Sequence, residues 1–81
     1  MFRSKEQKQE RQKSRIERRV EALPTAELLP WTEQLVYSVG RNLSGWQKTQ
    51  DSFYLEEARI AAEALYVITE ALNKRTQSVK L

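Results

Sequence analysis

The segment between residues 53 and 74 constrains the fold most, because as a helix it is apolar over far more than one side. One apolar row alternates spacings of four and three residues: Tyr54, Ala58, Ala61, Leu65, Ile68 and Leu72. A second row lies beside it: Phe53, Ile60, Ala64, Val67 and Ala71. At about 100° of rotation per residue, these rows span about two-thirds of the circumference, against about 100° for an ordinary surface helix. A single partner helix cannot cover so wide an arc.

Two other segments also have helical patterns. Residues 5–23 are rich in Glu, Lys, Arg and Gln, which favour helices, and they end before Pro24. Residues 30–48 begin with a proline, which suits the first turn of a helix, and they place most of their apolar side chains on one arc: Trp31, Leu35, Val36, Val39, Leu43 and Trp46. We therefore predict an all-α fold without strands.

The domain organisation follows from the breaks between these segments. We expect a charged N-terminal helix or arm over residues 1–23, a connection over 24–29, a helical hairpin over 30–75 and a frayed tail over 76–81. Asp51 or Ser52 is expected to cap the last helix. Gly40 and Gly45 leave two interpretations of the middle helix open. It either crosses another segment closely at these small residues, or it ends early, near Asn42 or Ser44.

The wide apolar arc of residues 53–74 favours a homodimer. The chain has 81 residues, and domains of this size often need extra stabilisation such as a second subunit. The N-terminal helix offers little apolar cover, mainly Ile16, Val20 and Leu23. We expect two hairpins to associate through the third helix, along the following residues: Tyr54, Ala58, Ala61, Leu65, Ile68, Leu72, Ile60, Ala64 and Val67. The alternative is a monomeric three-helix bundle in which the N-terminal helix folds back.

The positive charge is concentrated at the N-terminus. Residues 1–23 contain eight Lys/Arg and four Glu, whereas the whole chain carries a net charge of +3. On a helix five of these cations form one uninterrupted basic ridge: Lys8, Arg11, Arg15, Arg18 and Arg19. Such a ridge suits an acidic protein partner or the phosphates of nucleic acid. Without residues placed to read bases, nucleic-acid contact would be nonspecific. The ridge is equally consistent with a merely solvated helix.

Composition argues against catalysis and against stable membrane insertion. The chain has no cysteine and no histidine, so disulfides, ordinary zinc or haem sites and the commonest general base are excluded. We expect no enzymatic activity, no cofactor and no metal. No apolar run approaches the roughly 18 residues that span a bilayer, and the expected location is the cytoplasm. Tyr37 and Tyr66 point away from the expected core and are candidate surface contacts.

These patterns predict a small helical protein–protein interaction module, such as an adaptor, a regulator or an accessory subunit. The hairpin would supply self-association, and the N-terminal helix would supply an electrostatic contact. The alternative prediction is a small nucleic-acid-binding protein that contacts phosphates through the basic ridge.

Overall fold

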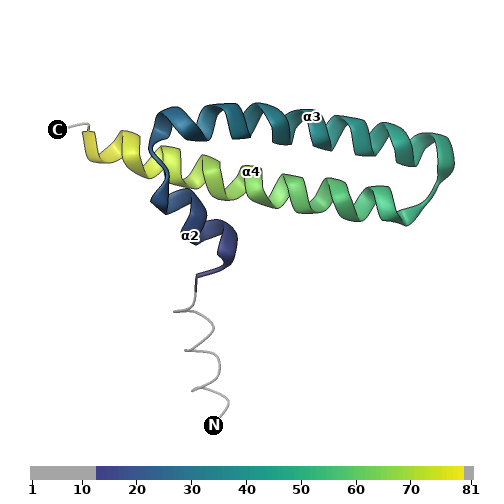
Figure 1. Cartoon of the computed structure of the whole chain (residues 1–81), viewed down its shortest axis with the longest axis horizontal. Coiled ribbons are helices and arrows are strands. Elements are labelled where there is room, and N and C mark those ends of the chain that lie inside the picture. The colour runs from purple at the N-terminus through teal and green to yellow at the C-terminus, as the bar shows by residue number, and fades with distance from the viewer. Residues whose placement is uncertain (1–12, 80–81) are drawn as a thin grey trace, which may run out of the picture.

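The computed structural model describes residues 13–79, and these residues form three helices and no strand (Figure 1). The helices are α2 (Arg15–Ala22), α3 (Thr25–Thr49) and α4 (Ser52–Val79). Helices α3 and α4 lie side by side as an antiparallel hairpin, and the short α2 packs against α4 near the open end of the hairpin. The predicted all-α fold is confirmed. None of these helices combines the length and apolar character required to cross a membrane.

Helix α2 begins with a reciprocal capping pair. The Ser14 hydroxyl accepts a hydrogen bond from the Glu17 amide at 3.1 Å, and the Ser14 amide donates to the Glu17 carboxylate at 2.8 Å. This arrangement satisfies two backbone donors that a helix start leaves without partners. The helix ends at Ala22, ahead of extended backbone at Leu23 and Pro24. Residues 5–12 of the predicted N-terminal helix lie outside the described residues.

Helix α3 begins at Thr25, so the predicted connection over residues 24–29 and the predicted start at Pro30 are wrong. Pro30 lies inside the helix, where it removes one backbone hydrogen bond. The Glu27 and Leu28 amides both donate to the Pro24 carbonyl, at 2.9 and 3.3 Å, and form the first turn. Because α3 starts at Thr25, the Leu28 side chain lies in the core. Burial of a leucine contributes about 1.5–3 kcal/mol, which offsets much of the proline's cost.

The hairpin turn resolves the two interpretations of Gly40 and Gly45. Helix α3 continues to Thr49, so an early end near Asn42 or Ser44 is wrong. A close crossing is found at Gly45, where a Cβ atom would lie 2.8 Å from the Tyr54 ring. Gly40 has no such neighbour within 4 Å. The crossing therefore depends on one glycine of the pair.

Two residues redirect the chain between α3 and α4. Gln50 has a left-handed backbone with φ of 61°, and its amide donates to the Trp46 carbonyl at 2.6 Å. The Asp51 carboxylate then accepts from the Phe53 amide at 2.9 Å, so Asp51 is the cap of the two candidates, Asp51 and Ser52, that the sequence offered. Helix α4 runs to Val79, so residues 76–79 are helical and not the frayed tail expected there.

The core draws one residue from each helix: Val20, Leu28 and Ile68 are almost completely buried against one another. Helix α2 therefore covers part of α4, although its apolar residues are few. The single chain has the arrangement of the three-helix alternative.

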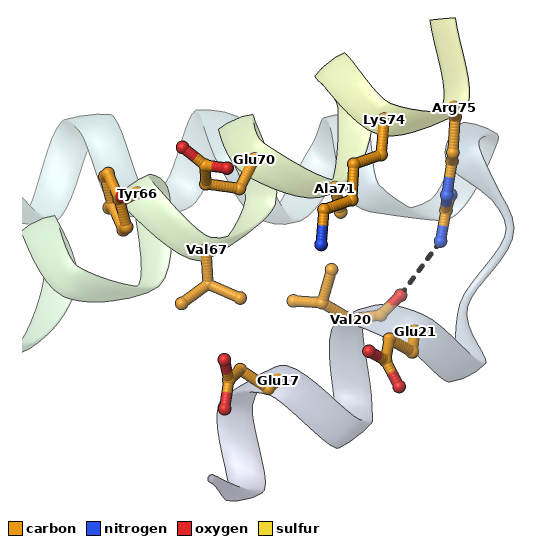
Figure 2. Close-up of a pocket in the computed structure, with 9 residues that line it drawn as sticks. All are labelled: Glu17, Val20, Glu21, Tyr66, Val67, Glu70, Ala71, Lys74 and Arg75. Carbon is orange, nitrogen blue, oxygen red and sulfur yellow. Dashed lines mark hydrogen bonds between the residues drawn. The ribbon is translucent and has the colours of Figure 1, made fainter. Parts of the chain in front are cut away.

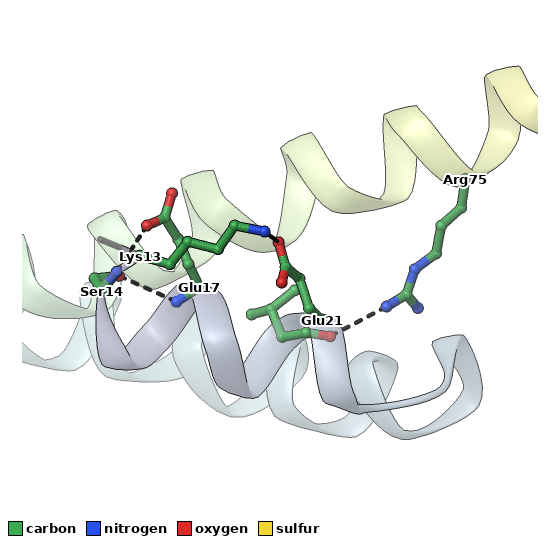
Figure 3. Close-up of polar contacts among 6 residues, drawn as sticks. Lys13, Ser14, Glu17, Glu21 and Arg75 are labelled. Atoms are coloured by element: carbon green, nitrogen blue, oxygen red, sulfur yellow. Dashed lines mark hydrogen bonds and ion pairs between the residues drawn. The ribbon is translucent and has the colours of Figure 1, made fainter. Parts of the chain in front are cut away.

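A polar clamp fixes the junction between α2 and α3. Arg75 of α4 donates to the Val20 and Leu23 carbonyls at 3.1 and 2.9 Å, and to the Thr25 hydroxyl at 2.9 Å. Figure 3 shows the guanidinium reaching from α4 to the C-terminal end of α2. Carbonyls at a helix C-terminus lack donors within the helix. The Val20 carbonyl also accepts from the Leu23 amide at 3.3 Å; Arg75 adds donors from α4 and holds the short helix on the hairpin.

Candidate interaction surfaces

Most of the predicted self-association row of α4 is occupied within one chain. Ala58, Ala61, Ala64 and Ile68 are buried. Four further members of the predicted set are half-buried: Tyr54, Leu65, Val67 and Leu72. Ile60 is the exposed member, with 44% of its surface accessible. Because α3 and α2 already cover most of this set, a second copy has little of it to bind.

A different apolar surface is left exposed, on α3. Leu29, Val36 and Leu43 are spaced by seven residues and form one row along the helix. All three are exposed, and Val36 has 58% of its surface accessible. Trp31 marks the side of α3 that contacts α2, and Val36 lies about 140° around the axis from it. The row therefore faces away from α2.

On α4, Leu55 is also exposed, but it lies only about 20° around the helix from Tyr66, which borders the cavity beside α2. We therefore call the three residues of the α3 row, Leu29, Val36 and Leu43, the apolar face. The sequence placed Val36 and Leu43 on the core arc, and Leu29 in a connection. The seven-residue spacing of Leu29, Val36 and Leu43 can be read from the sequence. The three residues form one row on a helix only because α3 starts at Thr25.

The basic ridge is only partly described. Lys8 and Arg11 lie outside the described residues, whereas Arg15 and Arg18 are exposed on α2. The Arg19 guanidinium lies 4.6 Å from the centre of the Trp31 ring, an attractive cation–π contact. Arg19 thus takes part in packing α2 on α3. A contact of this ridge with acidic protein or nucleic acid stays a prediction.

A cavity of about 280 Å³ opens between α2 and α4. In Figure 2 Glu17 and Glu21 border it from α2, and Tyr66, Glu70 and Lys74 border it from α4. Tyr66 is exposed, as predicted from its position on the helix. Glu21 pairs with Lys13 at 2.6 Å, and this hydrogen bond raises the pKa of Lys13 (Figure 3). In the described part of the chain, no cluster of acidic residues is suited to hold a metal ion.

The outer side of α4 carries charges that neutralise one another. Arg59 pairs with both Glu56 and Glu63 along the helix. The hydrogen bond from Arg59 lowers the pKa of Glu56, and the same bond raises the pKa of Arg59. These are exposed pairs at spacings of three and four residues, which stabilise a helix surface modestly. They offer little net charge to a partner.

A groove of about 600 Å³ lies near the hairpin turn. Its lining combines aromatic, basic and small polar side chains: Tyr37, Ser38, Arg41, Asn42, Ser44, Gly45, Lys48, Phe53 and Tyr54. We call it the aromatic–basic groove. Tyr37, the other predicted surface aromatic, has 68% of its surface accessible.

Comparison with protein-family models, curated proteins and solved structures finds no match to this chain.

Proposed function

We propose that this protein is a non-enzymatic interaction module that self-associates through the apolar face. One observation carries the proposal: Leu29, Val36 and Leu43 form an exposed aliphatic row on the side of α3 opposite α2. Removing apolar surface from water contributes roughly 25 cal/mol per Å². A contiguous exposed apolar surface is therefore a common sign of a protein–protein contact.

The row lies within a wider strip that contains no charge. Between the three exposed residues, α3 places Thr32, Val39 and Trp46, all half-buried and uncharged. Interface centres are depleted in charged residues because desolvating a charge is costly. The strip has this composition over the length of α3, so a partner surface without charge is the one that fits it.

The size of the hairpin is adequate for a dimer. Helix α3 has 25 residues, which corresponds to about 37 Å, and two adjacent helices are about 20 Å wide. One face of the hairpin thus measures roughly 700 Å², close to the roughly 800 Å² that each partner buries in a standard interface. A contact over much of this face would give a moderately stable dimer.

A second copy is the occupant that the chain itself supports. Residues 1–12 contain two strongly apolar side chains, Met1 and Phe2, among six charged residues, so this segment cannot match the row. A second copy presents the same seven-residue repeat. Two such faces related by a twofold axis form a self-complementary contact and a four-helix core. The dimer predicted from sequence is retained in this proposal, with its interface moved from the third helix to the exposed row of α3.

A matched pair of variants tests this interface. Leu43 and Ile60 are each 44% exposed, but Ile60 lies two helical turns from Val67, on the side of α4 where α2 packs. We expect Leu43→Glu to yield a monomer in light scattering, because it places a charge in the contact. Ile60→Glu should keep the mass of the unsubstituted chain. The interface is wrong if Ile60→Glu dissociates the protein while Leu43→Glu does not, provided that circular dichroism shows both variants folded.

A further inference from the structure

The aromatic–basic groove is separate from the apolar face. Helix α2 packs against the α4 residues that border the cavity, and Trp31 of α3 contacts its Arg19. The groove involves residues 37–48 of α3 and the first turn of α4. Phe53 lies two turns before Ile60, on the side of α4 that α2 uses further along. The groove thus continues that side toward the hairpin turn, away from the proposed self-association surface.

We propose that the aromatic–basic groove binds an acidic segment of a partner protein. Arg41 and Lys48 would pair with two carboxylates of that segment. Tyr37 and Phe53 would cover an apolar side chain between them. The proposal does not depend on self-association, because none of these four residues belongs to the apolar face.

The charges of the groove are the first observation that supports binding of an acidic segment. Arg41 and Lys48 are seven residues apart on α3, so they are separated by about 10 Å along the helix axis. Neither cation forms an ion pair with another described residue. Among the described residues that line the groove, none is acidic. This contrasts with Arg59, which two glutamates neutralise. The groove therefore presents two available cations, and a carboxylate can bind an arginine through two parallel hydrogen bonds.

The exposed aromatic rings of the groove are the second observation that supports this proposal. Phe53 has 58% of its surface accessible and Tyr37 has more. The Phe53 ring packs edge-on against Tyr54, with 5.5 Å between the ring centres, so it has a defined orientation. Tyrosine, phenylalanine and arginine are enriched at the centres of protein interfaces. Ser38 and Gly45 also line the groove, and the missing side chain of Gly45 lets the Tyr54 ring, which supports Phe53, lie close to α3.

A protein segment fits better than nucleic acid. Affinity for nucleic acid grows with the number of phosphates that are neutralised, and this groove offers two cations. Asp51, Glu56 and Glu57 lie within about one turn of its α4 edge and would repel a long polyanion. A short peptide with two acidic residues about 10 Å apart carries less negative charge, so those carboxylates repel it less.

A direct binding measurement tests the proposal. The probe is a fluorescein-labelled octapeptide, Ser-Gly-Glu-Leu-Phe-Glu-Gly-Ser, whose two glutamates lie about 10 Å apart when it is extended; it is titrated with the full-length protein at low salt and followed by anisotropy. A second probe has Gln in place of every Glu, and a third is a labelled twelve-residue oligothymidylate. We expect the acidic peptide to bind, the Gln peptide to bind at least about tenfold more weakly, and binding to weaken with salt.

Two double variants with equal charge loss locate the contact. Arg41→Gln with Lys48→Gln removes the groove cations, and Arg15→Gln with Arg18→Gln removes two exposed cations of α2. We expect the first pair to weaken binding of the acidic peptide about tenfold, and the second pair to change it less than about twofold. Tyr37→Ser with Phe53→Ser should weaken binding severalfold while both cations remain.

Each other outcome overturns the proposal in a distinct way. Equal weakening by both charge pairs would mean diffuse attraction, and weakening by the α2 pair alone would assign the contact to the basic ridge. If oligothymidylate bound more tightly than the acidic peptide, and if Arg41→Gln with Lys48→Gln abolished that binding, the groove would be a nucleic-acid site. No binding of the acidic peptide at millimolar protein would leave the groove without this ligand. The molar mass of each variant, recorded in the same samples, reports separately on self-association.

Discussion

A Cβ atom added to Gly45 of α3 would lie 2.8 Å from Cδ1 and 2.9 Å from Cε1 of Tyr54 on α4. The two helices approach closely at this point because position 45 has no side chain. Tyr54 in turn supports the Phe53 ring. The Gly45–Tyr54 contact thus sets the spacing of the helices beside the aromatic–basic groove.

Alanine substitutions at the two glycines should have opposite effects. Gly40→Ala should raise the free energy of unfolding by about 1 kcal/mol, because alanine favours the helix and meets no neighbour. Gly45→Ala gains the same propensity but must displace the Tyr54 ring, an overpacking cost of about 1–3 kcal/mol. In urea denaturation, the free energy of unfolding should therefore be higher for Gly40→Ala than for the unsubstituted chain, and lower for Gly45→Ala. Equal stabilisation by both substitutions would contradict the close contact.

The turn between α3 and α4 contains a residue in an unfavourable conformation. Gln50 has a positive φ of 61°, a region that costs non-glycine residues roughly 1 kcal/mol or more. We expect Gln50→Gly to stabilise the protein by about 0.5–1 kcal/mol, since its two side-chain hydrogen bonds are long, at 3.4 and 3.5 Å. Thermal unfolding followed by circular dichroism measures the change. A lower melting temperature would show that these bonds outweigh the backbone strain.

The Arg75 clamp should govern the docking of α2. Replacing Arg75 with Gln removes its bonds to the Val20 and Leu23 carbonyls, at a cost of about 1–2 kcal/mol for charge-assisted bonds near the surface. We expect amide hydrogen exchange to accelerate in α2 more than in α3. Lys74→Gln is the matched control, because Lys74 borders the same cavity. Comparable acceleration in both variants would argue against a specific clamp.

The Glu56–Arg59 pair predicts a pH-dependent difference in stability. The pKa of Glu56 is lowered from an ordinary value of 4.5 by its hydrogen bond with Arg59. Its contribution to stability is therefore complete above about pH 4.5 and is lost as the pH falls through the lower folded-state pKa. The melting temperature of the unsubstituted chain should exceed that of Glu56→Gln at pH 7, and the difference should shrink as the pH falls below 4.5 and Glu56 is protonated.

A neighbouring substitution controls for the general loss of negative charge. Glu57→Gln removes the same charge one residue further along, outside the Arg59 pairs. A pH dependence that is identical for Glu56→Gln and Glu57→Gln would show that Arg59 has no specific effect.

The helical class and the turn before α4 were predictable because their signals are local. Alternating spacing of apolar residues identifies α4, and an aspartate before Phe53 is a typical N-cap. The start of α3 was not predictable in this way. Pro30 carries a strong start signal, but burial of Leu28 against Val20 and Ile68 favours a helix that begins at Thr25. That tertiary contact is invisible in the local pattern.

The apolar face was missed in the sequence for the same reason, the wrongly predicted start of α3. Once residues 25–29 are helical, Leu29 joins Val36 and Leu43 in one row, and the apolar face becomes recognisable. The cover that α2 gives to α4 was underestimated, because counting its apolar residues ignored the Arg75 clamp and the Arg19–Trp31 contact. The aromatic–basic groove combines residues from two helices, and Tyr37 alone among them was predicted from the sequence to be a surface contact.

Self-association through the apolar face is the central claim, and the molar mass of the unsubstituted full-length chain tests it most directly. Light scattering should be recorded over a concentration series from micromolar to millimolar. We predict a mass that rises to twice that of the 9.5 kDa chain and stays there. A mass of 9.5 kDa throughout the series would contradict the claim and would leave the row of Leu29, Val36 and Leu43 to a different partner.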